Sequence, residues 1–187
     1  MCFYGASGCD GRHTCSYGLH RSLWRFLALR AVIDMPSTLD SLKLLIDKEA
    51  NVNSKGSTGD TALMAAASAG RTENAVLLLD RGSQIEARDN HGDTALMIAA
   101  AGRGIPSAST VSLLIERGAN IEARAKDGNT ALILAADCGG CEDASIVGLL
   151  LSEGANVRAR NNQGPSALEM ASRKARPDVV SLLSFLF

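Results

Sequence analysis

The chain is 187 residues long, with 46% hydrophobic, 4% aromatic and 21% charged residues and a formal net charge of −1. This near-zero charge gives no electrostatic attraction to nucleic acid or to an anionic membrane, and no apolar run reaches the roughly 18 residues of a membrane-spanning helix. The five cysteines are an odd number and cannot form a closed disulfide framework, so a reducing compartment, and hence the cytoplasm, is expected.

The first part of the chain has no clear periodicity. Residues 1–18 are rich in glycine and cysteine and are predicted to be a flexible tail. The stretch LHRSLWRFLALRAVI at 19–33 is basic and amphipathic, which is compatible with a membrane-surface or targeting helix. Its segment RFLALRA at 25–31, however, aligns with a phrase that is repeated further on. This alignment favours a degenerate first repeat that caps one end of an array.

Two phrases recur four times each in the rest of the chain. The first reads GDTALMAAA at 59–67, GDTALMIAA at 92–100, GNTALILAA at 128–136 and GPSALEMAS at 164–172. The second reads LLIDKEANVN at 44–53, LLLDRGSQIEA at 77–87, LLIERGANIEA at 113–123 and LLLSEGANVRA at 149–159. Both have spacings of 33, 36 and 36 residues. Two phrases that keep one register predict a repeated structural unit.

Each unit is predicted to be a helix, a turn, a second helix and a loop. In the unit that begins at Gly92, Thr94 is expected to cap the first helix and Thr110 the second. Gly92 and Gly118 suit left-handed backbone at a turn and after a helix. One helix pair cannot bury its own apolar face, so the copies are expected to stack. Small alanine pairs, which allow neighbouring helices to approach closely, stand at Ala66–Ala67, Ala99–Ala100 and Ala135–Ala136.

The pattern G-D/N-T-A-L-x-x-A-A, followed by V-x-L-L-I/L-x-x-G-A-N-I/V, resembles the ankyrin repeat over roughly residues 25–187. The resemblance implies an all-α solenoid of about five stacked helix-turn-helix units. β-hairpin-like loops would join the units, and degenerate repeats would cap both ends. A single domain at 19–187 would hold repeats at approximately 19–54, 55–87, 88–123, 124–159 and 160–187.

The sequence departs from the family pattern at several positions. The family has a histidine that bonds to the capping threonine, and this chain has Met64, Met97, Ile133 and Glu169 there. Apolar packing is therefore expected to replace that hydrogen bond. The turns between paired helices are predicted to be long at 102–110 and 137–145 and short in the last repeat.

The chain ends in SLLSFLF. Phe185 and Phe187 could fold back onto the last repeat as a cap, or they could mark a truncated array. The sequence leaves both possibilities open.

The resemblance implies a protein–protein interaction scaffold, expected to be a monomer without catalytic activity, cofactor or metal. Its partner would be a protein, with no nucleic acid and no membrane involved, and would contact the concave surface of loop tips and first helices. His91 at one tip fits a contact role better than a catalytic base, because no nucleophile recurs near it. The predicted contact residues are Ser57, Thr58, Asp60, Ser68, Asn90, His91, Asp93, Ala101, Lys126, Asp127, Asn129, Asp137, Asn162, Gln163, Arg173 and Lys174.

Four cations occupy one slot, four residues before each repeat glycine: Lys55, Arg88, Arg124 and Arg160. They should form a basic column along the edge of the loops. The column could simply be solvated, or it could steer an acidic partner toward the surface.

The CGGC motif from Cys138 to Cys141 has the spacing of metal knuckles and redox pairs. One pair supplies only two of the four ligands that a structural zinc needs. A glycine-rich turn with incidental thiols is the simpler interpretation. The alternative function is a thiol redox or metal-binding module centred on Cys138 and Cys141.

Overall fold

The computed structural model describes residues 39–48, 50–102, 104–105, 107–138 and 144–185. The predicted tail at 1–18 and the first helix of the predicted first repeat lie outside this part of the chain. The described residues form nine α-helices and no extended strand, with one isolated antiparallel bridge between Arg160 and Ser166. The helices are α2 (Leu39–Asp47), α3 (Ala62–Ser68), α4 (Thr72–Asp80), α5 (Ala95–Ala100), α6 (Ala108–Glu116), α7 (Ala131–Asp137), α8 (Ser145–Ser152), α9 (Ala167–Arg173) and α10 (Pro177–Ser184).

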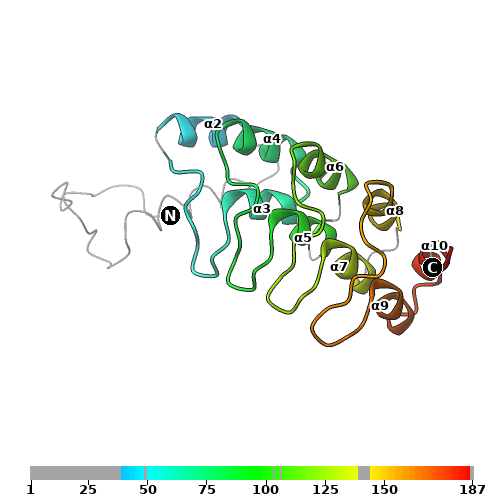
Figure 1. Cartoon of the computed structure of the whole chain (residues 1–187). Helices are drawn as coiled ribbons and strands as arrows, with labels where there is room; N and C mark the ends of the chain where they lie inside the picture. Colours follow the sequence, from blue (N-terminus) through cyan, green and yellow to red (C-terminus); the bar gives the residue numbers. More distant parts are fainter. Residues whose placement is uncertain (1–38, 49, 103, 106, 139–143, 186–187) are drawn as a thin grey trace, which may run out of the picture.

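The helices form two rows (Figure 1). The first helices of the repeats, α3, α5, α7 and α9, pack on one another in sequence, and α2, α4, α6 and α8 form the second row. Each first helix also packs on the second helix of its own repeat. The loops that join successive repeats all project to the same side of the stack. This arrangement confirms the predicted all-α solenoid.

Local hydrogen bonds fix where the first helices begin. The residue before each of them has an extended backbone, and its hydroxyl accepts the backbone N–H three residues later. For Thr94 this bond goes to the N–H of Met97 at 3.4 Å, as predicted. The equivalent caps are Thr61, Thr130 and Ser166.

The predicted cap of the second helix in the same repeat was wrong. Helix α6 begins at Ala108, and its N-cap is Ser107, whose hydroxyl accepts the N–H of Thr110 at 3.3 Å. Thr110 therefore lies inside the first turn of the helix and is fully buried. Its hydroxyl pairs instead with that of Thr72, at the start of α4, over 2.8 Å. A contact with the preceding repeat thus explains the threonine that looked like a cap.

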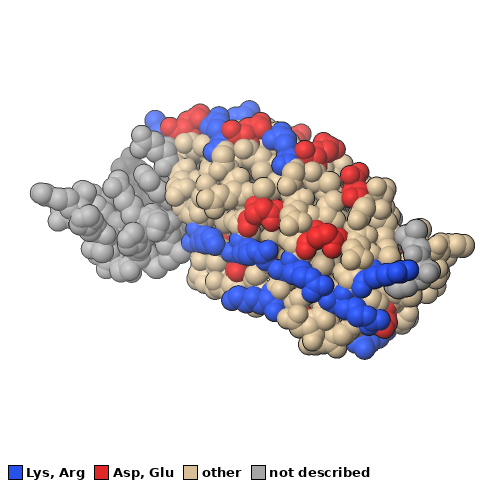
Figure 2. Space-filling model, in the orientation of Figure 1, with Lys and Arg blue, Asp and Glu red and all other residues tan. Residues whose placement is uncertain are grey.

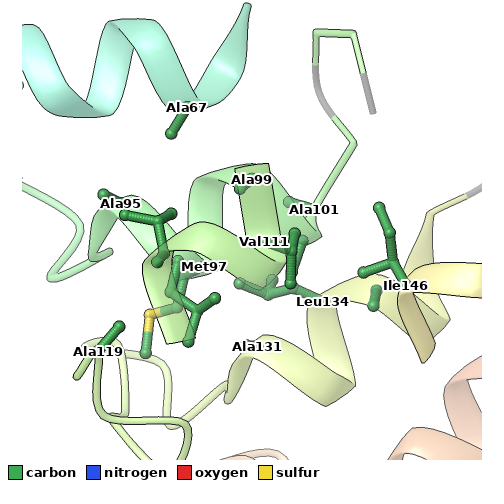
Figure 3. Packing of buried hydrophobic residues seen from close by; sticks show 14 of the residues in the cluster. Ala67, Ala95, Met97, Ala99, Ala101, Val111, Ala119, Ala131, Leu134 and Ile146 are labelled. Atoms are coloured by element: carbon green, nitrogen blue, oxygen red, sulfur yellow. The ribbon is translucent and has the colours of Figure 1, made fainter. Parts of the chain in front are cut away.

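The core consists of small and aliphatic side chains. All six residues of the alanine pairs are at most 3% exposed. Figure 3 shows Ala67 pointing from α3 toward the helix that carries Ala99. Met64, Met97 and Ile133, which replace the family's histidine, are also buried. The expected replacement of the hydrogen bond by apolar packing is confirmed at these three positions. Met64 also keeps a hydrogen bond to the cap, because its sulfur accepts the N–H of Thr61 at 3.4 Å.

The turns within the repeats have two lengths, as expected. Three residues separate α3 from α4 and α9 from α10, whereas seven separate α5 from α6 and α7 from α8. The longer turn at 101–107 reaches the preceding repeat, where the N–H of Ile105 donates to the carbonyl of Ser68 at 2.9 Å.

The C-terminal helix is only partly covered. Val179 and Leu183 of α10 are fully buried, but Phe185 is 86% exposed. Phe185, at the C-cap of α10, therefore does not fold back onto the last repeat as a cap. Phe187 lies outside the described residues.

Candidate partner-binding surface

The loop tips are linked into one row by backbone hydrogen bonds between neighbouring repeats (Figure 1). We call this the tip row: residues 57–59, 90–92, 126–128 and 162–164. At each junction an N–H of one tip donates to a carbonyl of the preceding tip at 2.9 or 3.0 Å. The bonded pairs are Asn90 with Thr58, Lys126 with His91, and Asn162 with Asp127.

Glycine is required where the tips meet. Gly92 has a φ of +84°, and a Cβ at this position would lie 2.9 Å from the backbone nitrogen of Lys126. A side chain here would both strain the backbone and separate the two tips. The repeat glycine recognised in the sequence therefore serves the contact between repeats as well as its own turn.

Two predicted contact residues are structural joints within the tip row. The side-chain amide of Asn90 donates to the carbonyl of Ser57 at 3.2 Å. The amide of Asn162 donates in the same way to the carbonyl of Lys126 at 2.9 Å. Both asparagines stand two residues before the repeat glycine. This shared position was the feature of the sequence that could have indicated a structural role.

Most of the predicted contact residues reach the surface, but two do not. Asp93 is 5% exposed and Ala101 is 8% exposed, so neither can offer a side chain to a partner. The backbone N–H of Asp93 donates to the carboxylate of Asp89, and its carbonyl accepts the N–H of Asp89. Ala101 ends α5 at the start of the long turn. The exposed members are Ser57, Thr58, Asn90, His91, Lys126, Asp127, Asn162, Gln163, Arg173 and Lys174, and the half-buried ones are Asp60, Ser68, Asn129 and Asp137.

Several of these residues contact one another. The ammonium of Lys174 lies 3.3 Å from the carboxylate of Asp137, which joins the turn after α9 to the end of α7. The side chain of Asn129 donates to Asp127 at 2.7 Å and accepts from Asn161 of the next repeat at 2.9 Å. These bonds fix polar groups in place beside the tip row.

The basic column is aligned as predicted, and hydrogen bonds order it. Lys55 donates to the carbonyl of Arg88 at 2.7 Å, Arg88 to that of Arg124 at 2.5 Å, and Arg124 to that of Arg160 at 2.9 Å. Each cation thus bonds to the backbone of its counterpart in the next repeat. Figure 2 shows a row of Lys and Arg side chains running across the loops.

Arg160, the last member of the column, differs by an ion pair. It donates to the carbonyl of Gly164 at 2.6 Å, as Arg88 does to that of Gly92 at 2.9 Å, and it also lies 3.0 Å from the carboxylate of Glu169 in α9. The pKa of Glu169 is held below its ordinary value of 4.5, mainly because its carboxylate accepts the N–H of Ser166, with Arg160 adding to the effect.

A second series of contacts between repeats escaped the sequence reasoning. Asn53, Glu86 and Glu122 occupy one slot, and each side chain accepts a backbone N–H of the following repeat at 2.8 Å. Glu86 and Glu122 stand two residues before Arg88 and Arg124 of the basic column. Their spacing of 33 and 36 residues, equal to that of the repeat, was the signal.

The cysteine turn is only partly described. Cys138, the residue after α7, is 9% exposed and disulfide-bonded, and Cys141 lies outside the described residues. A sulfur in a disulfide is not available as a thiolate ligand. In the described part of the chain no three His, Cys, Asp or Glu side chains are placed to hold a metal ion. No helix there is long and apolar enough to cross a membrane.

Stacked helix pairs with projecting, linked loops define a helical repeat solenoid. A family model described as ankyrin repeats (3 copies) matches residues 29–125 and also residues 100–185. These matches cover most of the chain, which therefore belongs to the ankyrin repeat family. Ankyrin repeats are generally protein–protein interaction modules, and proteins built from them are typically scaffolds and not enzymes. No curated protein matches the chain.

Proposed function

We propose that this chain is a monomeric, non-enzymatic scaffold that binds a protein partner through the tip row and the adjoining first helices. The residue before each tip glycine carries the argument. In three repeats its carbonyl accepts the bond from the next tip, a contact that does not depend on the side chain. The side chain at this position is exposed in all four repeats and differs in each: Thr58, His91, Asp127 and Gln163.

At this position the backbone holds the stack together, while the side chain is available to a partner. Because the bonds between tips use backbone atoms, the exposed side chains can differ without disturbing the stack. The four side chains offer a hydroxyl, an imidazole, a carboxylate and an amide along one line. A protein surface with matching donors and acceptors is a suitable partner for such a line.

The proposal is tested with the double variant His91→Ala, Asp127→Ala. Wild-type and variant chains are used as bait in a pull-down from lysate, and the retained proteins are quantified by mass spectrometry. We expect the variant to lose specific proteins that the wild type retains, because a contact residue can contribute more than about 1 kcal/mol to binding. Its melting temperature should fall only slightly, since exposed positions usually affect stability by less than about 0.5 kcal/mol and the bonds lost at Asp127 come from Asn129 of the same loop.

The matched control is Glu116→Ala with Glu153→Ala, which changes two exposed residues on the second-helix side. The control should retain the same proteins as the wild type. Loss of those proteins by the control, with retention by the tip variant, would place the binding surface on the opposite side of the stack and end the proposal.

A thiol redox role for the cysteine turn is the second candidate, favoured by the disulfide at Cys138. Thiol titration of the full chain, before and after mild reduction and with and without a chelator, tests it. Reversible appearance of thiols upon reduction supports the redox role. Thiols that appear only after chelation of a metal contradict it.

A further inference from the structure

Three cations of the basic column keep an uncompensated charge. Lys55, Arg88 and Arg124 are exposed and donate to neutral backbone carbonyls. In the described part of the chain no carboxylate lies within ion-pair distance of them, whereas Arg160 is paired with Glu169. A hydrogen bond to a neutral carbonyl orients a cation but leaves its charge in place. The column therefore presents three ordered positive charges, one per repeat.

The nearby acidic side chains are directed elsewhere. Glu86 and Glu122 bond to the backbone N–H groups of Asn120 and Asn156, each at 2.8 Å. In Figure 2 the row of basic side chains is continuous, and acidic side chains lie between it and the second helices. Glu86 and Glu122 thus border the basic row on the side of the second helices, with their carboxylates engaged by backbone N–H groups.

The side chains of the column are also prepared for binding. Both bonds of Arg88 use Nη1, and the bond of Arg124 uses Nη2. Because a guanidinium has five N–H donors, each arginine keeps donors for the two-point pairing that carboxylates accept. Side chains that are already ordered lose less conformational entropy when a ligand binds.

We propose that Lys55, Arg88 and Arg124 form a docking strip for an extended acidic segment of the protein partner, with one carboxylate per repeat. This inference rests on the proposed function, since it assigns a chemical class to part of the partner. Neighbouring packed helices lie about 8–10 Å apart, and an extended chain advances roughly 3.3 Å per residue. The matching segment therefore carries Asp or Glu at about every third position. A nucleic acid suits the strip less well, because the acidic border would repel a second line of phosphates.

The probe is a fluorescein-labelled peptide with three Glu at every third position and Gly and Ser elsewhere. Its binding to the full chain is measured by fluorescence anisotropy over a series of salt concentrations. We expect binding that weakens with salt, and roughly three- to tenfold weaker binding to Arg88→Gln, Arg124→Gln, the size expected for two exposed charge pairs. A peptide with Gln in place of Glu should not bind, and one with three adjacent Glu should bind less well.

The matched control is Arg81→Gln with Arg117→Gln. It removes the same net charge from the second-helix side, where these arginines are paired with Asp47 and Asp80 at 2.8 Å. The control should bind the spaced peptide as the wild type does. Equal loss in both variants, or unchanged binding to Arg88→Gln, Arg124→Gln, would overturn the inference. Stronger competition by a single-stranded oligonucleotide than by the spaced peptide would overturn it too.

Two further measurements keep the test decisive. The variant Arg88→Lys, Arg124→Lys retains the charge, so it should keep most of the peptide binding even if the Gln variant is less stable; loss of binding by a folded Lys variant would count against the strip. In the pull-down, if the Gln variant of the strip keeps the proteins that the tip variant loses, the docking strip is wrong although the proposed function stands.

Discussion

Ala175 is the only non-glycine residue of the described chain with a positive φ, at +53°. It stands in the short turn between α9 and α10, in the slot that Gly70, with a φ of +63°, occupies between α3 and α4. Both residues come directly before the arginine at the N-cap of the second helix. An L-residue in left-handed backbone costs roughly 1–2 kcal/mol. Ala175 thus has backbone strain that Gly70, in the equivalent position of another repeat, does not have.

Ala175→Gly is expected to raise the free energy of unfolding by about 0.5–1 kcal/mol. Relief of the left-handed strain exceeds the roughly 0.4–1 kcal/mol that glycine costs through the unfolded chain. Urea unfolding measures the change. The reciprocal variant Gly70→Ala should lower the stability, because its Cβ would also lie 2.9 Å from the carbonyl oxygen of Ile105. A gain in stability for Gly70→Ala would contradict this account.

Glu169 makes stability depend on pH. Its pKa is lowered in the folded chain, first by the N–H of Ser166 and then by Arg160. A group with a lowered folded pKa contributes stability above its unfolded pKa, and this contribution is lost as the pH falls through the folded value. Glu169→Gln keeps an acceptor for the capping bond but has no charge to titrate.

The wild type is therefore expected to be more stable than Glu169→Gln above pH 4.5, with a difference that shrinks as the pH falls below that value. Urea midpoints over a pH series measure this difference. Glu153→Gln, which removes an exposed charge from the C-cap of α8, is the control. A difference between Glu169→Gln and the wild type that stays constant across the series would show that the capping bond does not depend on the charge.

At the scale of elements, a buried cation joins the last helix pair to the preceding repeat. Arg176, at the N-cap of α10, is 7% exposed. Its guanidinium donates to the carbonyl of Ala135 in the last turn of α7 at 2.9 Å. Carbonyls at a helix C-terminus lack partners within the helix and carry partial negative charge. The arginine supplies both a donor and a compensating charge at this point.

Arg176→Met is expected to lower the free energy of unfolding by about 1.5–3 kcal/mol, the range for a hydrogen bond to a charged group. Methionine keeps much of the apolar stem but has no N–H donors. Urea unfolding gives the size of the effect, and hydrogen exchange should show faster opening of α9 and α10. Arg173→Met, at an exposed position on α9, should change the stability by less than about 0.5 kcal/mol. Arg176 also lies 3.4 Å from the carboxylate of Asp178, so equal effects of the two variants would mean that the contacts of its guanidinium together contribute nothing.

At the scale of the whole molecule, stability depends on contacts between neighbouring repeats. In a solenoid each repeat contacts only its neighbours, so a defect at one interface weakens the chain at that point. Three kinds of contact stabilise the described interfaces: packing of buried alanines, backbone hydrogen bonds between tips, and hydrogen bonds from side chains to the backbone of the following repeat. The alanine packing depends on side-chain size, and the two kinds of hydrogen bond depend on the alignment of one repeat with the next.

Ala99→Leu tests the dependence on size. Ala99 lies on α5 and is 3% exposed. A leucine there has no space, so the stack must shift, at an expected cost of about 1–3 kcal/mol in unfolding free energy. Thermal or urea unfolding measures it. Ser109→Leu adds a similar side chain at an exposed position on α6 and should be nearly neutral; a stability of Ala99→Leu equal to the wild type would mean that the interface is not tightly packed.

Features that depend on nearby residues could be predicted from the sequence. The repeat period, the helix pairs, the caps at Thr94 and its equivalents, and the glycine turns all follow from patterns a few residues long. Their bonds close within one helical turn or one loop, so a short phrase contains all the atoms involved. For the same reason the alanine pairs could be placed in the core from periodicity alone.

The contacts between repeats, in contrast, became evident only from the fold. The burial of Asp93 and Ala101, the joint made by the amide of Asn90, and the contact that takes Thr110 away from a capping role were not evident from local patterns. The asparagine amide and the threonine hydroxyl bond to atoms 33 and 38 residues away along the chain. Whether such a polar side chain faces a partner or a neighbouring repeat depends on how the repeats stack. The same short polar residue suits an exposed tip and a bond between tips, and only its position in the stack distinguishes the two.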